Sequence, residues 1–498
     1  MTHLTRPMER RARRTSTWFT LFAAQSDSSL SLRDRICATI RGAIQSGHVG
    51  NGDRLPSTRV LAADLRVSRV TAEAAYEQLE AEGYVRRRIG DGTFVDIDVQ
   101  PNRISALTRP APQRPDKLEP SWSSRGRRII RGGACTDPTE AMAFSAGFPD
   151  LAEFPVETWR RLTARCLRRD ARLILGYGNP AGEPALRAAV ARYLAQSRRV
   201  SCGPEQVIIL TSSQQALHLV ATLLTETSDT VWIEEPGYRG AKTALAAMGA
   251  KLQPIPVDGD GLTMPNNGSA RRPRLIYVTP SHQYPIGVTL SLPRRLALIE
   301  YARRCDAWIV EDDYDSEFQF DGRPTPSMQG LDDGGRILYV GTFSKVLFPA
   351  LRLAYLVVPE SLVDGFVRAR TTQDGHSARL SQLVTADFID EGHFAAHVRQ
   401  MRQLYHHRRD LLLSEIDQRL QPWCRPIGFA AGLQLTVALP KKREASLTRA
   451  AAMAGVVTPV LSELFLSNPA LDGWILGFAA LPDEAIVEGV RRLSTLAR

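Results

Sequence analysis

Short apolar runs alternate with longer amphipathic stretches from about residue 143 to the end of the chain. The runs contain almost no polar residues and fall at 207–210, 231–233, 275–278, 308–310 and 337–340. Amphipathic stretches such as 185–196 and 213–226 lie around and between them. Uninterrupted apolar runs of this length are typical of strands buried on both faces, as in a parallel sheet. Strands separated by helices therefore predict a three-layer α/β domain with a mostly parallel sheet.

Residues 30–97 follow a helical pattern and predict a separate compact unit. An apolar residue recurs every four positions on one helix face, at Ile36, Ile40 and Ile44. Serines stand where two further helices would begin, at Ser57 and Ser68. On the second of these helices we expect three residues to face inward: Val70, Ala74 and Leu79. Residues 86–95 follow as a basic hairpin with a Gly-rich tip, so the unit is predicted to be a winged helix-turn-helix.

Residues 98–140 differ from both neighbouring regions because prolines interrupt them and no periodicity persists. These prolines stand among arginine, serine and glycine, at Pro101, Pro110, Pro112, Pro115, Pro120 and Pro138. Such a composition is typical of a flexible, partly extended linker. With 498 residues the chain is too long for a single core. We therefore predict a basic flexible arm at 1–28, a winged helix-turn-helix at 29–97, a linker at 98–140 and an α/β domain at 141–498.

The charge of the chain adds a partner to this picture. The formal net charge is +10, and much of the basic excess lies before residue 140. A basic region beside a more balanced one indicates a polyanion, here double-stranded DNA, as the partner of the first part. No apolar run approaches the roughly 20 residues of a membrane span, so we expect no membrane partner. The six scattered cysteines form no C-x-x-C pair, which predicts free thiols in a reducing cytoplasm rather than disulfides or a zinc site.

The predicted winged helix carries residues suited to contact with DNA. The first turn of its second motif helix would bring Ser68, Arg69 and Thr71 to base edges in the major groove. Arg69 would either read a guanine or bind a phosphate. Arg59, on the preceding helix, is placed for the DNA backbone, and Gly90 at the wing tip would let the main chain approach the duplex closely. The alternative is that these charges are solvated on a protein-binding winged helix.

The segment 341–352 carries the most distinctive candidate chemistry of the α/β region. Lys345 follows a turn rich in hydroxyl groups, and Arg352 comes about two helical turns later. A lysine amine can condense with an aldehyde cofactor, while hydroxyl groups and an arginine can bind the phosphate of that cofactor. The segment therefore predicts a cofactor-binding lysine beside a phosphate-binding turn.

Residues 55–95 resemble the DNA-binding domain of GntR-type regulators. The similarity lies in the stretches 55–65, 67–71, 75–79, 82–84 and 92–95, which read LPSTRVLAADL, VSRVT, AYEQL, EGY and GTFV. These stretches run through nearly the whole predicted unit. The resemblance implies a DNA-binding head on a bacterial protein that works in the cytoplasm, at the nucleoid.

Residues 143–498 resemble the fold-type I enzymes that depend on pyridoxal phosphate (PLP), in the aminotransferase-like version found in MocR regulators. The resemblance implies that Lys345 forms the Schiff base with PLP. The phosphate contacts that it implies come from Arg352, Thr342 and Ser344 in the lysine turn, from Ser212, Ser213 and Gln214 at the start of a helix, and, across a dimer, from Tyr177. The implied fold is a three-layer α/β aminotransferase fold.

The same resemblance assigns residues to the cofactor ring. Asp312 would pair with the protonated pyridine nitrogen, and Tyr314 would hydrogen-bond the ring hydroxyl. Tyr238 would stack on the ring, and residues 280–287 would line its edge. Each of these residues alone fits an ordinary structural role equally well. Their joint order along the chain carries the assignment.

Three positions depart from the pattern of the family. Ser212 stands where a glycine is usual in the phosphate cup, so we expect crowding of the backbone there. Gln434 stands where a histidine is common. Ile475 aligns with the arginine by which amino-acid aminotransferases bind the substrate carboxylate. A buried carboxylate without a cation is costly, so Ile475 argues against ordinary amino-acid transamination and against a carboxylate-bearing effector.

The combination of the two parts leaves three hypotheses. In the first, the chain is a MocR-type transcriptional regulator whose effector is PLP itself, an amine or an amino acid. Such regulators form head-to-tail homodimers, and a linker of this length could span that arrangement. In the second, the chain is an active aminotransferase with a DNA-binding head, with half-transamination as its residual chemistry. In the third, the large part is only a dimerisation scaffold, which would not require Lys345, Asp312 and Arg352 together.

Overall fold

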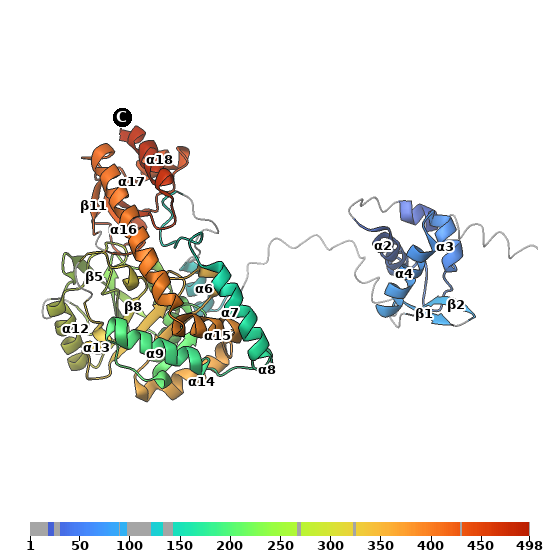
Figure 1. Cartoon of the computed structure of the whole chain (residues 1–498), viewed down its shortest axis with the longest axis horizontal. Coiled ribbons are helices and arrows are strands. Elements are labelled where there is room, and N and C mark those ends of the chain that lie inside the picture. The colour runs from blue at the N-terminus through green and yellow to red at the C-terminus, as the bar shows by residue number, and fades with distance from the viewer. Residues whose placement is uncertain are drawn as a thin grey trace, which may run out of the picture. The chain divides into compact units, whose positions relative to one another are not determined.

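The computed structural model describes residues 18–23, 30–88, 90–96, 121–132, 143–265, 270–321, 325–428 and 431–497. The chain forms two compact units, Met1–Pro120 and Ser121–Arg498, and each has its own hydrophobic core (Figure 1). Within the described residues, every helix is too short or too polar to cross a lipid bilayer. The described cysteines are all free thiols: Cys37, Cys166, Cys202, Cys305 and Cys424.

The first unit is a winged helix-turn-helix, as predicted. It consists of α2 (Leu32–Gln45), α3 (Thr58–Leu65), α4 (Arg69–Ala81), β1 (Val85–Arg88) and β2 (Gly92–Val95). Each helix begins after a serine whose hydroxyl accepts a hydrogen bond from the first turn, at Ser31, Ser57 and Ser68. Arg66 makes the corner between α3 and α4 in a left-handed conformation with a φ of 54°. The two strands pair antiparallel and form the wing.

The inward face of α4 differs from the predicted one. The buried residues are Ala72, Ala75, Tyr76 and Leu79. Val70 is 78% exposed, so the prediction that it faces inward is wrong. Val70 precedes Leu79 by about two and a half helical turns, which places the two side chains on opposite faces. Val70 therefore lies on the exposed face of α4, next to Arg69.

Two described segments have helical structure in regions predicted to lack it. Residues 18–23, within the predicted arm, are helical, and Trp18 and Phe22 belong to the core of the first unit. Within the predicted linker, α6 (Ser124–Arg131) begins after the capping Ser123. None of its residues is buried. The rest of the arm and linker lies outside the described residues, and the domain boundaries stay a prediction.

An eight-stranded sheet forms the centre of the second unit, in the order β3-β10-β9-β8-β7-β4-β5-β6. The strands are β3 (Val207–Leu210), β4 (Thr230–Glu235), β5 (Lys251–Asp258), β6 (Gly261–Leu262), β7 (Leu275–Val278), β8 (Trp308–Asp313), β9 (Ile337–Thr342) and β10 (Ala354–Val357). The neighbours from β5 through β4, β7 and β8 to β9 are parallel. β10 is antiparallel to both β9 and β3, and β6 is antiparallel to β5. The mostly parallel sheet is confirmed, whereas β5, β6 and β10 were not among the predicted strands.

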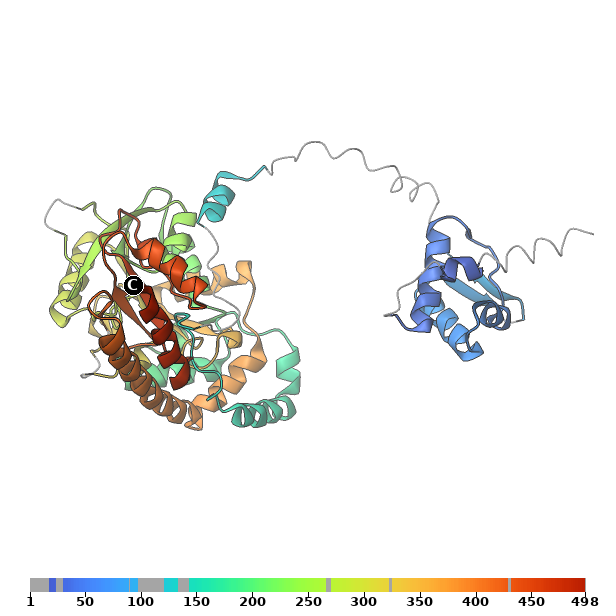
Figure 2. The same ribbon diagram turned by 90° about the horizontal axis from the view of Figure 1, so that it is seen from above.

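Helices cover both faces of this sheet and make three layers (Figure 2). Along β9, Leu338 and Val340 point to one face, and Ile337 and Tyr339 point to the other. The first face packs against α10 (Ser213–Leu224), α11 (Arg239–Ala247) and α14 (Val363–Gln373). The second face packs against α9 (Pro184–Arg198), α12 (Leu292–Cys305), α13 (Met328–Leu331) and α15 (Arg379–Asp390). Burial on both faces is the reason that the strands read as continuous apolar runs.

A smaller antiparallel sheet follows, made of β11 (Arg425–Ile427), β12 (Gln434–Ala438) and β13 (Gly473–Gly477). The helices α17 (Glu444–Met453) and α18 (Asp483–Ser494) lie beside it. The long helix α16 (His393–Arg419) runs from the large sheet to this smaller one (Figure 1). Before the large sheet, the chain forms α7 (Val156–Arg169) and α8 (Ala171–Leu175). This C-terminal part brings β12 to the edge of the site.

Candidate functional site

The parallel strands of the large sheet end at one edge, where the residues that follow them line a cavity of about 560 Å³. Ligands of α/β folds bind at this edge because the loops after neighbouring strands diverge there. Every predicted cofactor residue except Tyr177 lines this cavity: Ser212, Ser213, Gln214, Tyr238, Asp312, Tyr314, Thr342, Ser344, Lys345 and Arg352. Elements separated by more than a hundred residues therefore meet where the resemblance implies a cofactor site.

Lys345 stands in the turn that follows β9. The backbone N–H of Ser344 donates to the Thr342 hydroxyl over 3.1 Å, which tightens this turn. Gly147 approaches the lysine from a distant segment, because a Cβ added there would lie 3.0 Å from Lys345 Nζ. Gly147 also has a φ of +76°, which a larger residue would adopt only with strain. A glycine at this position therefore keeps the space around the amine open.

Asp312, at the end of β8, presents a buried carboxylate to the cavity. Its Oδ2 accepts a hydrogen bond of 2.7 Å from the Tyr277 hydroxyl, while its Oδ1 has no partner among the described residues. Burial raises the pKa of Asp312 to about 7, against the lowering effect of the bond from Tyr277. A buried acceptor without a donor is costly, so this oxygen suits a ligand N–H such as a protonated ring nitrogen.

The opposite end of the cavity is rich in donors. Ser212 caps α10, and the N–H groups of the first turn of that helix, Ser213 and Gln214, begin at the cavity. Arg352 follows a short 3-10 helix (Pro349–Leu351), and its guanidinium pairs with no described residue. A helix N-terminus, hydroxyl groups and a free arginine together favour a phosphate.

The expected crowding at Ser212 is not found. Ser212 has a φ of −169° and a ψ of 159°, an extended conformation that any residue adopts. Its hydroxyl accepts a hydrogen bond of 3.1 Å from the backbone N–H of Gln215. The serine therefore replaces the usual glycine without strain and adds a helix cap.

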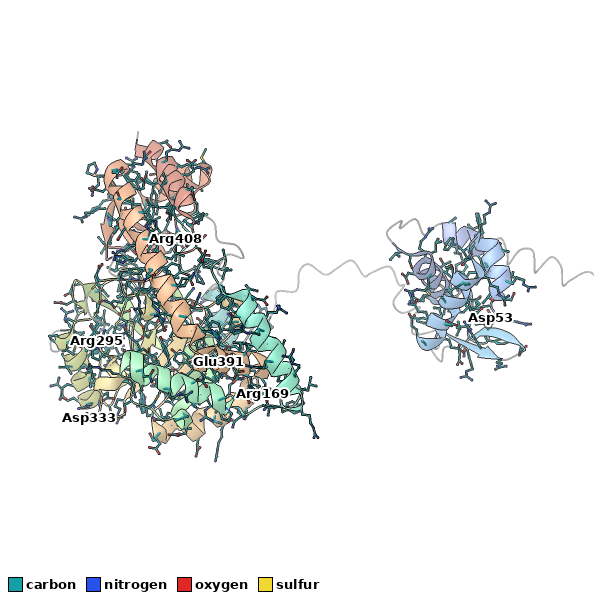
Figure 3. The ribbon with its side chains drawn as sticks, in the orientation of Figure 1. Asp53, Arg169, Arg295, Asp333, Glu391 and Arg408 are labelled. Carbon is teal, nitrogen blue, oxygen red and sulfur yellow. The ribbon has the colours of Figure 1, made fainter. Side chains whose placement is uncertain are left out.

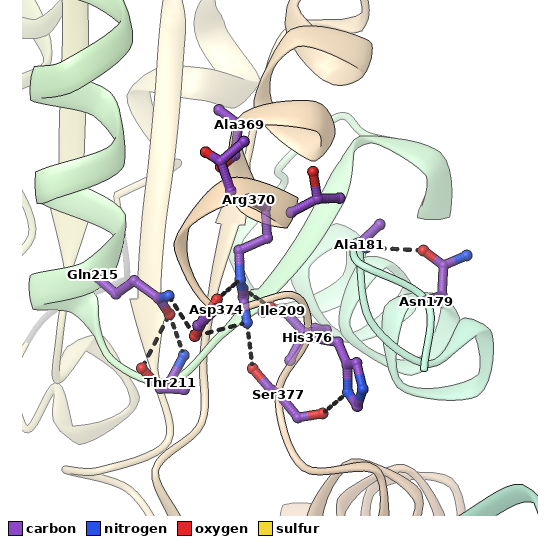
Figure 4. A network of polar contacts seen from close by, with 12 residues as sticks. Asn179, Ala181, Ile209, Thr211, Gln215, Ala369, Arg370, Asp374, His376 and Ser377 are labelled. Carbon is purple, nitrogen blue, oxygen red and sulfur yellow. Dashed lines mark hydrogen bonds and ion pairs between the residues drawn. The ribbon is translucent and has the colours of Figure 1, made fainter. Parts of the chain in front are cut away.

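A polar network behind this turn holds it in place (Figure 4). The fully buried Arg370 donates to the carbonyl of Ile209 at the end of β3 over 2.8 Å and also pairs with Asp374. Gln215 donates to Asp374 over 2.9 Å and accepts from the backbone of Thr211 over 2.8 Å. The network connects α14 to the start of α10, so it fixes the phosphate end of the cavity.

Aromatic rings and a histidine form a wall of the cavity where the resemblance implies the cofactor ring. Tyr238 meets Tyr284 edge to face at 5.7 Å between ring centroids, and Tyr284 meets Tyr314 in the same way at 6.1 Å. The Tyr314 hydroxyl lies 3.0 Å from His282 Nδ1, which also contacts the carboxylate of Asp315. Burial raises the pKa of Tyr314 well above its usual range, so its hydroxyl keeps its proton. Tyr314 is thus held in place as a hydrogen-bonding group for a ligand.

The segment that carries Gly147 is fixed by a buried ion pair. Arg408, labelled in Figure 3, lies on α16 and donates to Asp150 Oδ2 over 2.7 Å. Tyr405, one turn earlier on α16, accepts a hydrogen bond of 2.8 Å from the backbone N–H of Asp150. The backbone N–H of Gly477, at the end of β13, donates to the carbonyl of Phe144. These contacts hold the loop over Lys345.

Tyr177 and Ile475 lie outside the cavity of their own chain. Tyr177 is 95% exposed, and its ring contacts His376 edge to face at 6.2 Å. Ile475 is buried in β13 opposite Thr436 and does not line the cavity. Gln434, at the start of β12, does line it. The cavity therefore has an amide on the side from which β12 and β13 approach.

The DNA candidates lie together on the surface of the first unit. Arg59, Ser68 and Arg69 are exposed at the start of α3 and α4, and Thr71 is half-buried. Thr71 and Ser68 share a hydrogen bond of 2.7 Å between their hydroxyl groups. Neither Arg59 nor Arg69 pairs with a described residue. Gly90, in the wing, is exposed with a φ of +80°. The predicted residues thus leave two unpaired guanidinium groups near the helix-turn-helix.

Sequence reasoning missed several residues that line the cavity or support it. They are Gly147, His218, Tyr277, Thr279, Tyr284 and the pair of His282 with Asp315. Tyr277 sits inside an apolar strand, where a tyrosine looks like core. Tyr284 and His282 belong to the segment 280–287, which was assigned to the cofactor edge only as a whole. Gly147 has no signal of its own, because its partner Lys345 is distant in the sequence.

Comparisons with known proteins agree with both units. Residues 139–493 match the family model "Aminotransferase class I and II", and residues 32–95 match "Bacterial regulatory proteins, gntR family". A probable rhizopine catabolism regulatory protein MocR of Rhizobium meliloti is 41% identical over 468 residues, which is 94% of each chain. The HTH-type transcriptional regulator TauR of Rhodobacter capsulatus is 34% identical over 78% of this chain and 80% of its own.

A solved aminotransferase structure is similar to the second unit. LysN, an α-aminoadipate aminotransferase of Thermus thermophilus in complex with N-(5'-phosphopyridoxyl)-L-leucine, superposes with a TM-score of 0.66 and 29% identity. The match covers 75% of this chain and 94% of LysN. The second unit therefore has the fold of this aminotransferase over most of its length.

Proposed function

The chain belongs to the MocR group of gntR-family regulators, and we propose that it is a transcriptional regulator that senses a small molecule through bound PLP. Its aminotransferase class I and II domain takes PLP as its cofactor. In the proposed function, the effector is PLP itself, an amine or an amino acid. An effector alters promoter binding only through a difference in its affinity for two arrangements of the protein.

The observation that carries the proposal is that one cavity contains both a buried hydrogen-bond acceptor without a donor and hydrogen-bond donors without an acceptor. At one end, Asp312 has a buried oxygen without a donor. At the other end, Arg352 and the backbone N–H groups of Ser213 and Gln214 have no acceptor among the described residues. The amine of Lys345 lines the same cavity. A molecule with a basic ring nitrogen, an aldehyde and a phosphate satisfies all three, and PLP has this composition.

The residues of the site take separate roles in this proposal. Bound PLP would supply an aldehyde for amines and an electron-withdrawing ring. Lys345 Nζ would hold the cofactor covalently, and Asp312 would keep a proton on the ring nitrogen. Tyr314 would donate to the ring hydroxyl, and Tyr238 would pack on the ring. Phosphate binding would rest on Ser212, Ser213, Gln214, Thr342, Ser344 and Arg352, with Tyr177 added across a dimer.

The winged helix would carry the response to promoter DNA. In the proposed mode, α4 enters the major groove, with Ser68, Arg69 and Thr71 at the base edges. Arg59 binds the DNA backbone, and the left-handed Gly90 lets the wing approach the duplex. We place the protein in the cytoplasm as a head-to-tail homodimer at its operator, with residues 98–140 spanning between the two parts.

A working aminotransferase with a DNA-binding head is the second candidate. Lys345, Asp312 and Tyr314 are the groups that a half-transamination requires, and all three line the cavity. Against turnover of amino acids stands the buried Ile475, where the resemblance implies an arginine for the substrate carboxylate. Regulation is therefore the main proposed role, with residual chemistry as the alternative.

The test of the cofactor site is a variant without the proposed covalent anchor. Full-length Lys345→Ala, loaded with PLP and desalted, should lose the visible absorbance that the wild-type protein retains. Lys441→Ala, the same change at an exposed lysine outside the cavity, is the matched control and should keep it. Persistence of the band in Lys345→Ala would show that the cofactor is anchored elsewhere.

A further inference from the structure

The cavity has few cations for its size. Among the described residues that line it, the arginine and lysine side chains are Arg352 and Lys345. In the proposed function both are used by the cofactor, one by its phosphate and the other by its aldehyde. His218 lies one turn along α10 from Gln214, and therefore on the phosphate side. The described lining offers no further arginine or lysine to an effector.

The position from which the family's arginine would bind a carboxylate also offers no positive charge to the cavity. Ile475 is buried in β13, and its strand neighbour Thr436 donates to the backbone of Pro285. An effector carboxylate would thus lose its hydration without gaining a cation. The chemistry of the cavity favours an effector without a negative charge.

Gln434 supplies the recognition group that an uncharged effector needs. Its side chain is only 3% exposed, it lines the cavity, and its Oε1 has no partner among the described residues. A Cβ added at Gly147 would lie 3.7 Å from Gln434 Oε1 and 3.0 Å from Lys345 Nζ. The amide and the lysine amine therefore flank the same small space. A buried amide without a partner at this point is a ready acceptor and donor for a ligand.

The position of Gln434 is fixed by the backbone. It begins β12, where it pairs with Gly477 of β13. Gly477 is itself locked against the loop of Gly147, since a Cβ on it would lie 2.0 Å from the carbonyl oxygen of Ser145. The backbone of Gln434 thus cannot move away from the lysine without displacing the strand, and burial restricts the rotamers of its side chain. A fixed hydrogen-bonding group discriminates by geometry, because a ligand without a matching group leaves it unpaired.

We propose that Gln434 selects the effector, and that the effector is a primary amine bearing a hydroxyl or similar neutral hydrogen-bonding group and no carboxylate. The amine end of the effector occupies the space beside Lys345, and the neutral group bonds the Gln434 amide. A hydroxyl both donates and accepts, which matches both halves of a carboxamide. This inference rests on the proposed function, since it assigns Lys345 and Arg352 to PLP.

The experiment compares three small amines by calorimetric titration into PLP-loaded, full-length protein. The probes are 3-amino-1-propanol, β-alanine and n-propylamine. All three share an aminoethyl group, and at the other end they carry a hydroxymethyl group, a carboxylate and a methyl group, respectively. Wild-type protein should bind the aminoalcohol about tenfold more tightly than either of the others. In Gln434→Leu, the aminoalcohol should lose about tenfold in affinity and become equal to n-propylamine, whose affinity should not fall.

Controls separate this inference from the proposed function and from misfolding. Gln400→Leu makes the same change at an exposed position of α16 and should keep the wild-type order of affinities. Gln434→Asn keeps an amide but shortens it, so it should weaken only the aminoalcohol. The visible absorbance of the cofactor should be unchanged in all three variants. If the wild-type protein showed no such absorbance after loading with PLP, the proposed function itself would be contradicted.

Several outcomes would overturn the inference while the cofactor stays bound. One is tighter binding of β-alanine than of 3-amino-1-propanol by the wild-type protein. Another is an equal fall in the affinities for the aminoalcohol and for n-propylamine in Gln434→Leu. That result would show that the amide does not contact the hydroxyl. No detectable binding of the aminoalcohol would overturn it as well.

Discussion

At the scale of single residues, Asp312 connects the cofactor site to the pH dependence of stability. Burial raises the pKa of Asp312 in the folded, cofactor-free protein to about 7, from an ordinary value of 3.8. The folded state therefore keeps a proton that the unfolded state has released across this window. Stability then falls as the pH rises from about 4 to 7, and the loss is complete above pH 7.

We predict that Asp312→Asn removes this pH dependence. Between pH 5.5 and pH 8, the cofactor-free wild-type protein should lose on the order of 2 kcal/mol more stability than the variant. Thermal melting of both proteins at the two pH values measures the difference. Asp364→Asn, an exposed change on α14, should behave like the wild type. Parallel pH profiles of wild type and Asp312→Asn would rule out the raised pKa.

The sequence predicted the residues of the site that stand in loops at strand ends, and missed those whose role depends on a distant contact. Asp312 and Lys345 belong to local motifs whose chemistry is visible in the sequence. Tyr277 becomes recognisable only when β7 pairs with β8 and its hydroxyl reaches Asp312. Gly147 becomes recognisable only when its loop packs over Lys345. Such contacts depend on the fold and leave no periodic pattern.

At the scale of elements, the buried strands were predictable from the sequence. Which face of a surface helix is buried was harder to predict. Strands covered on both faces read as apolar runs, which located β3, β4, β7, β8 and β9. The helix α4 carries the apolar Val70 on its exposed face, so a simple inward assignment fails there. An exposed valine beside Arg69, at the start of the proposed recognition helix, is suited to a thymine methyl group.

We predict that Arg69→Ala weakens binding to the operator without changing the cofactor. A bidentate contact with guanine is worth about 1–3 kcal/mol, so affinity should fall about ten- to a hundredfold. Gel shifts with the promoter fragment of the regulated gene measure the loss. The control is Arg41→Ala. Arg41 lies on α2 and is paired with Glu82, so its loss should leave DNA affinity near the wild-type level. An unchanged affinity of Arg69→Ala would contradict the proposed orientation of α4.

At the scale of the whole molecule, we propose that the cofactor site is completed across a dimer. Tyr177 is 95% exposed and lies outside the cavity of its own chain, although the resemblance assigns it to the phosphate. In the proposed dimer, this exposed tyrosine would reach the phosphate site of a second copy of the chain.

A mixed dimer distinguishes a Tyr177 that acts across the interface from one that acts within its own chain. Tyr177→Phe alone should lower PLP affinity about tenfold, because it removes a hydrogen bond to a charged phosphate. Lys345→Ala alone should lose the visible absorbance of the cofactor. When the two variants are mixed and exchange subunits, the site with an intact Lys345 receives an intact Tyr177 from its partner. One site per mixed dimer should then regain wild-type affinity, whereas a tyrosine that acts within its own chain would restore none.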